Sequence, residues 1–108
     1  MAEQQVAIGH RPFVALSAAT ATGASGGVDL TWCASNASII LTVTGAPTAV
    51  SVNLEGSLDG TNWVVLKTLT AAGVGSSTGV PVRFIRANLT TLTGGTTPTV
   101  TALLGAGG

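Results

Sequence analysis

The sequence has few charged residues, and this shortage excludes a class of partner. Asp, Glu, Lys and Arg make up 7% of the chain, against roughly 25% in an average soluble domain. Four acidic side chains balance four basic ones, so the clustered Lys and Arg that bind a phosphate backbone are missing. We therefore expect no nucleic-acid partner. A net charge near zero instead favours association between protein molecules.

Cysteine is also scarce, because Cys33 is the only one. A single cysteine excludes an intrachain disulfide and a zinc site built from several cysteines, and it fits synthesis in a reducing compartment. The opening segment, MAEQQVAIGHRPF, lacks the basic and apolar regions of a signal peptide. No apolar run approaches the ~18 residues that cross a bilayer. We expect neither a signal peptide nor a membrane partner.

The groups that usually carry catalysis lack partners in the sequence. His10 is the only histidine, and its nearest charged neighbour is Arg11, whereas acid–base catalysis needs a group that orients the imidazole. We interpret His10 as a surface or interface residue. Cys33 ends the strand-like run DLTWC, which predicts a half-buried structural thiol rather than a nucleophile. The sequence therefore predicts no enzyme, and no catalytic, cofactor-binding or metal-binding residue.

Three carboxylates lie beyond the first eleven residues: Asp29, Glu55 and Asp59. A glycosidase pair needs two carboxyl groups across a cleft, but Asp59 has a structural task in a turn and Glu55 falls on the polar side of a strand pattern. The glycine-rich segments 23–27 and 73–79 contain no lysine, so neither is a phosphate-binding loop. We interpret both segments as connecting loops.

Aromatic residues are few, which bears on a sugar-binding function. The chain has only Phe13, Trp32, Trp63 and Phe84. Exposed tryptophans could stack on sugars, but a domain of this size needs large aromatic side chains to fill its core. We therefore predict that at least three of the four lie in the core.

Thr, Ser, Gly, Val and Ala dominate the composition, and Thr and Val fit a pleated sheet better than a helix. Apolar and polar residues alternate in short runs that Gly, Pro, Asn and Asp separate, which is typical of strands. The predicted strands are 12–17, 28–33, 39–44, 50–55, 62–69, 82–89 and 98–104. Between them we predict a turn at 34–37, a hairpin at Asp59-Gly60, a flexible loop at 71–79 and a polar turn at 90–97.

About seven strands at this spacing predict an all-β fold, a single β-sandwich of jelly-roll or Ig-like type. The chain divides into an N-terminal arm (1–11), the sandwich domain (12–104) and a flexible Gly-rich tail (105–108). The arm and the tail have too little apolar pattern to fold alone.

Two segments resemble a known family: VSVNLEGSLDGTNWVVLKTL (50–69) and VPVRFIRANLTTLTGGTTPTVTALLG (80–105). Together they resemble a domain of small structural proteins, of decoration or tail type, in tailed bacteriophages. In that domain a strand–S-x-DGTNW–strand hairpin precedes an R-[FY]-[IV]-R-A strand and a Thr/Gly-rich turn. The same motifs are similar to discoidin-type jelly rolls, which bind glycans or lipids through aromatic or basic loop tips. This chain lacks such tips, so the second resemblance supports the sandwich alone.

The shared motif has a structural interpretation. Asp59-Gly60 forms the turn, and Trp63 covers one end of the core. Arg83 and Arg86 fall on opposite faces of one strand, so they form no common site. At least one of them is expected to pair with Glu55 or Asp59.

The resemblance implies a non-enzymatic virion structural protein of a tailed phage, used for capsid decoration or cementing. The alternative is a tail, baseplate or head-fibre component with possible binding to a host receptor glycan. The implied partners are phage capsid or tail proteins and further copies of the chain, with a trimer favoured by analogy to phage decoration proteins. The implied location is the virion, after synthesis in the host cytoplasm, and no cofactor is expected.

Overall fold

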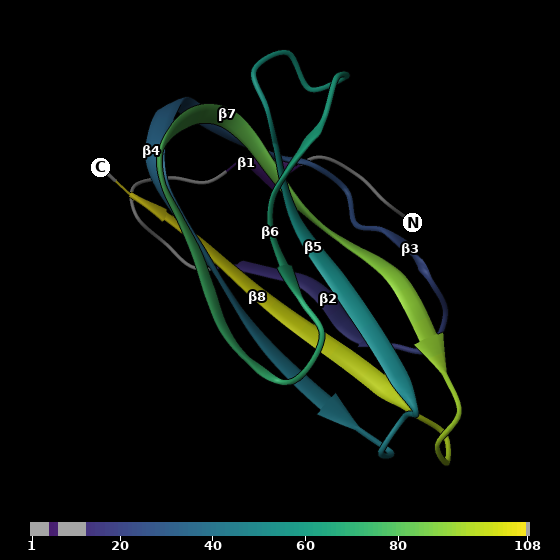
Figure 1. Ribbon diagram of the computed structural model, residues 1–108. Coiled ribbons are helices and arrows are strands. Elements are labelled where there is room, and N and C mark those ends of the chain that lie inside the picture. The colour runs from purple at the N-terminus through teal and green to yellow at the C-terminus, as the bar shows by residue number, and fades with distance from the viewer. Residues whose placement is uncertain (1–4, 7–12, 108) are drawn as a thin grey trace.

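A computed structural model describes residues 5–6 and 13–107, with the side chains of 14–30 and 33–106. These residues form eight β-strands and no helix, so the all-β prediction is confirmed (Figure 1). The strands are β1 (Gln5–Val6), β2 (Phe13–Ala19), β3 (Gly23–Ala24), β4 (Val28–Thr44), β5 (Ala49–Ser57), β6 (Val64–Leu69), β7 (Gly73–Thr93) and β8 (Thr99–Gly107). Within the described parts of the chain, no helix is long and apolar enough to span a membrane.

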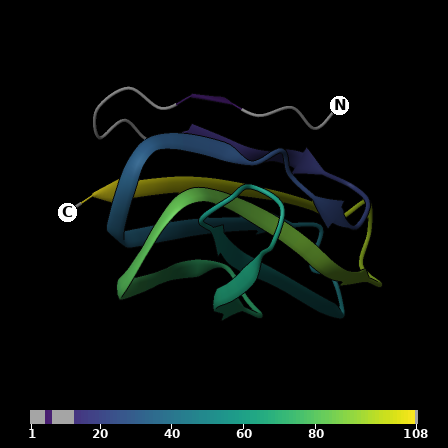
Figure 2. The ribbon, with the colours of Figure 1, turned by 90° about the horizontal axis from the view of Figure 1, so that it is seen from above.

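The strands follow the order β2-β8-β4-β7-β5-β6, and neighbours in this order are antiparallel. The short strand β1 lies parallel to β4, and β3 lies beside β7. Two strands are long, because β4 has 17 residues and β7 has 21. Residues 36–41 of β4 lie between β8 and the start of β7, whereas Val28 and Asp29 pair with Ile85 and Phe84. The two long strands therefore pass through both layers of the folded sheet (Figure 2).

The first layer consists of β2, β8, the second half of β4 and the start of β7. The second layer consists of β5, β6 and the rest of β7, beside the start of β4. Between the layers lies a core in which all sixteen buried residues are aliphatic. The most enclosed large side chains are those of Ile39, Leu54, Ile85, Leu89 and Leu104. Each alternates with an outward-facing neighbour, which is the pattern of a sheet with one covered face.

The prediction that at least three aromatic residues lie in the core stays a prediction, because the structure describes only two of the four side chains. Phe84 is buried at 9% exposed, next to the aliphatic core cluster, whereas Trp63 is only half-buried. Interleaved Val, Leu, Ile and Ala make up that cluster.

Four predicted breaks are wholly or partly strand in the structure: 34–37, 71–79, the polar turn at 90–97, whose first four residues belong to β7, and the loop at 23–27, whose first two residues form β3. The segment 34–37, predicted as a turn, belongs to β4, because Ala34 pairs with Val82 and Asn36 with Thr78 across register shifts. Such bulges bend a strand without reversing it. The predicted loop at 71–79 is likewise wrong beyond Ala72, because β7 begins at Gly73 and its first six residues pair with β4.

Strands extend beyond the predicted domain limits at both ends of the chain. Gln5 and Val6, within the predicted arm, pair with Val28 and Asp29, while the rest of the arm lies outside the described residues. At the other end, β8 continues to Gly107 and pairs with residues 36–38 of β4. The predicted limit at Leu104 therefore falls inside a strand.

Candidate interaction surfaces

Among the described residues, the candidate catalytic carboxylates Asp29, Glu55 and Asp59 each have separate hydrogen-bond partners. His10 lies outside the described residues. Cys33 is exposed, so the prediction of a half-buried thiol is wrong; it lies within the register shift between Asp29 and Ala34 of β4, next to buried Ala34. Among the described residues, no three His, Cys, Asp or Glu side chains lie close enough to hold a metal ion.

Glu55 is the centre of a polar cluster on the outer face of the second layer. Its carboxylate is buried and accepts hydrogen bonds from Arg86 Nε at 2.7 Å and from Asn88 Nδ2 at 3.1 Å. The Arg86 guanidinium also lies 4.3 Å from the centre of the Trp63 ring. Trp63 therefore holds an arginine in place rather than covering one end of the core as predicted. The pairing of Arg86 with Glu55 confirms the predicted ion pair.

The second arginine has a different partner. Arg83 Nε and Nη2 donate to the two carboxylate oxygens of Asp29 at 2.9 and 3.0 Å. This contact raises the pKa of Arg83, and the guanidinium lies 5.3 Å from the Phe84 ring centre. Asp29 and Glu55 therefore each have an arginine partner, so both carboxylates have a structural role in an ion pair.

Asp59 organises the hairpin between β5 and β6. Its Oδ1 accepts hydrogen bonds from the backbone N–H groups of Asn62 and Thr61, both at 2.8 Å, while Asn62 Nδ2 donates to Oδ2 at 2.7 Å. Ser57 Oγ donates to the carboxylate and accepts from Gly60 N. These donors hold the pKa of Asp59 well below its usual range. With Gly60 at φ +79°, the predicted Asp-Gly hairpin is confirmed and is internally braced.

Beside this turn is a hollow of about 330 Å³, which we call the hairpin end. Three apolar side chains around it are well exposed: Leu58 (66%), Val64 (57%) and Val80 (44%). Its lining residues are Gly56, Ser57, Leu58, Asp59, Asn62, Val64, Val80, Pro81 and Val82. The braced turn and neighbouring residues of β6 and β7 thus present apolar side chains to solvent.

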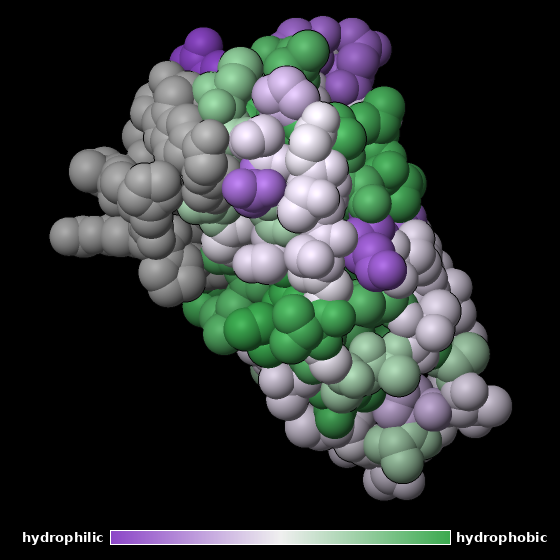
Figure 3. Space-filling model, turned by 60° about the vertical axis from the view of Figure 1, so that its left-hand side comes forward, coloured by the Kyte–Doolittle hydropathy of each residue, from purple (hydrophilic) through white to green (hydrophobic). Residues whose placement is uncertain are grey.

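The outer face of the first layer carries a second apolar feature. Val14 pairs with Leu103, Leu103 with Ile40, and Ile40 with Val74. These four residues form one row across four adjacent strands, and all are exposed. We call this row the ridge. Figure 3 brings the left-hand side of Figure 1 forward and shows a hydrophobic band across a paler, weakly polar surface.

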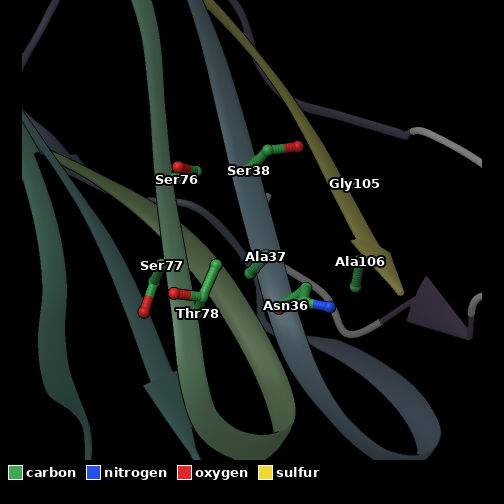
Figure 4. Close-up of a pocket in the computed structure, with 8 residues that line it drawn as sticks. All are labelled: Asn36, Ala37, Ser38, Ser76, Ser77, Thr78, Gly105 and Ala106. Atoms are coloured by element: carbon green, nitrogen blue, oxygen red, sulfur yellow. The ribbon is translucent and has the colours of Figure 1, made fainter. Parts of the chain in front are cut away.

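Next to the ridge lies a row of small residues. Ser38 pairs with Gly105 on one side and Ser76 on the other, two positions along each strand from the ridge. We call this row the trough. It borders a hollow of about 280 Å³ lined by β4, β7 and β8 (Figure 4): Asn36, Ala37, Ser38, Ser76, Ser77, Thr78, Gly105 and Ala106. None of these residues, nor any ridge residue, is charged.

Comparison with known proteins supports the fold. The SPBc2 prophage-derived protein YomS is similar at a TM-score of 0.69 and 8% identity, over 91% of this chain and 93% of that one. The PBSX exported protein XepA is similar at a TM-score of 0.58 and 13% identity, over 93% of this chain but only 39% of XepA. A family 89 glycoside hydrolase from Clostridium perfringens matches at a TM-score of 0.52 and 13% identity, over 89% of this chain and 14% of the enzyme. No protein-family model and no curated protein matches. The chain therefore shares its fold with prophage-derived YomS and with the PBSX exported protein XepA.

Sequence reasoning missed both apolar surfaces. The ridge joins residues that are far apart in the chain, and only the strand register brings them together. A partial signal was present in Ile39-Ile40 and Leu103-Leu104, because two adjacent apolar residues in a strand cannot both face the core.

Proposed function

We propose that the chain is a non-enzymatic structural protein of a tailed-phage virion, bound to the capsid as a decoration protein. The observation that carries this proposal is the match to prophage-derived YomS, which spans nearly the whole of both chains. The hairpin motif at 57–63 supports it, because the resemblance to phage structural proteins rests on the same residues. In this proposal the protein resides in the virion after synthesis in the host cytoplasm.

The partners of the carboxylates support a non-enzymatic function. Asp29 and Glu55 bind arginines, and Asp59 accepts hydrogen bonds within its own turn. A general acid or base must instead reach the substrate proton that it transfers.

We assign attachment to the hairpin end. Leu58, Val64 and Val80 present apolar area that gains free energy when water is removed from it. The hydrogen bonds of Asp59 already fix the turn, so less conformational freedom is lost on docking. The proposed partner is an apolar site on the assembled capsid surface.

The test is co-sedimentation of purified protein with undecorated capsids. Val64→Lys should weaken retention by roughly tenfold or more, because docking would bury an unpaired ammonium group. Val65→Lys is the matched control, since Val65 is 53% exposed but does not line the hairpin end. It should bind as the wild type does. Failure of the wild type to bind capsids, together with its presence in isolated tails, would overturn the decoration role.

Glycan binding by a tail or head-fibre component would need an aromatic ring free to stack on a sugar. The Trp63 ring has the Arg86 guanidinium against it. In a Trp32→Phe variant, we expect added glycans to leave the fluorescence and iodide quenching of Trp63 unchanged. Protection of Trp63 by a glycan would favour the tail-component alternative.

A further inference from the structure

We propose that two copies of the chain pair through the outer face of the first layer, with the ridge of each copy seated in the trough of the other. The proposal uses residues other than those that line the hairpin end, so it does not depend on capsid attachment. It names a second copy of this chain as the occupant of the face.

The pattern of large and small residues makes the face complementary to itself. On β4, Ile40 is two residues from Ser38; on β8, Leu103 is two residues from Gly105. The two rows are therefore about 7 Å apart along the strands. A two-fold axis in the interface, parallel to the rows and midway between them, places each ridge over the partner's trough. A two-fold interface requires this kind of self-complementary patch.

The start of β7 continues the same pattern, because exposed Val74 is two residues from Ser76. Three neighbouring strands thus each offer one large apolar residue beside one small residue. The hollow of about 280 Å³ bordering the trough supplies room for incoming side chains. A ridge of one copy would fill space that is open in the isolated chain.

Charge and area both permit the pairing. The outward positions of β4 from Asn36 to Thr44 and of β8 from Thr99 to Gly105 are all uncharged, so two identical faces do not repel each other. In this layer β4 and β8 share nine residue pairs, β2 has seven residues and six residues of β7 pair with β4, which give a face of about 490 Å² per copy at ordinary strand spacings. Two such faces bury roughly 1,000 Å² in total, at the lower end of what a specific interface needs.

The experiment is sedimentation equilibrium of the full chain at micromolar concentrations. The wild type should be a dimer, unlike the trimer that the family resemblance favours. Ile40→Lys and Leu103→Lys should each raise the dissociation constant roughly a hundredfold, because each dimer would bury two unpaired ammonium groups. Val65→Lys, an equally exposed valine outside the face, should leave the dimer intact.

The Gly105→Phe variant distinguishes pairing by shape complementarity from non-specific hydrophobic association. A Cβ at this position meets Ser38 Oγ at 3.5 Å, an ordinary contact, so the fold should tolerate the change. The added ring fills the trough and should break the dimer, although it increases the exposed apolar area. Stronger association of Gly105→Phe would overturn the proposal. A wild-type monomer or trimer, or a dimer that both lysine variants retain while folded by circular dichroism, would also overturn it.

Discussion

Replacing Arg86 by Met tests whether the polar cluster on the second layer stabilises the fold. The substitution keeps much of the side-chain volume but removes the donor to Glu55 Oε1, 2.7 Å away. The side chain of Glu55 is only 8% exposed, so its carboxylate stays buried and keeps the hydrogen bond from Asn88 Nδ2 at 3.1 Å. The contact between Arg86 and the Trp63 ring is lost as well.

The burial of Glu55 sets the expected loss in the free energy of unfolding. Breaking a fully buried ion pair costs about 3–5 kcal/mol. The Arg86 side chain is 24% exposed, and Asn88 still donates one hydrogen bond, so we expect a smaller loss of about 2–3 kcal/mol including the contact with the ring. For a domain of this size, that loss lowers the melting temperature by about 10 °C.

Urea unfolding of the wild type and two variants measures the effect. Arg86→Met should lower the free energy of unfolding by the amount above, whereas the double variant Glu55→Met/Arg86→Met should lie within about 1 kcal/mol of the wild type, because no buried charge is left unpaired. If the double variant is less stable than Arg86→Met, the unpaired carboxylate is not the cause of the loss, and the reasoning fails.

Three other predictions concern stability. Arg83→Met should cost less than about 1 kcal/mol in urea unfolding, because the Arg83 side chain in its pair with Asp29 is 47% exposed; a loss as large as that of Arg86→Met would contradict this. Gly95→Ala should cost more than about 2 kcal/mol in thermal unfolding, because Gly95 has φ +74° and an added Cβ would clash with the carbonyl oxygen of Gly45; an unchanged melting temperature would refute it. The lowered pKa of Asp59 contributes stability that is present above the ordinary pKa of an aspartate and is lost as the pH falls towards the folded-state value. Asp59→Asn should therefore lose less stability on acidification than the wild type. If the free energies of unfolding of the two proteins fall equally with pH, the Asp59 carboxylate does not make this contribution.

The sequence predicted the strand content and the hairpin because both are local signals. Alternation within 50–55 and the Asp59-Gly60 pair depend on residues next to one another. The β5–β6 hairpin and its braced turn follow directly from that pattern.

The errors arose where distant pairing overrides local preference. Residues 73–79, GVGSSTG, have a composition typical of a loop, yet pairing with β4 holds the first six of them in an extended strand. The turn predicted at 34–37 failed for the same reason, because bulges convert the break into a bend. The ridge was out of reach because Val14, Ile40, Val74 and Leu103 become neighbours only through the registers of three strand pairs.

The most direct test of the proposed function is a density map of the intact virion at a resolution that separates β-strands. The account predicts a small two-layered β-domain on the outer surface of the capsid, with the β5–β6 hairpin and Leu58 facing the capsid protein. Density for this domain only in the tail, or on the capsid with the hairpin pointing into solvent, would contradict it.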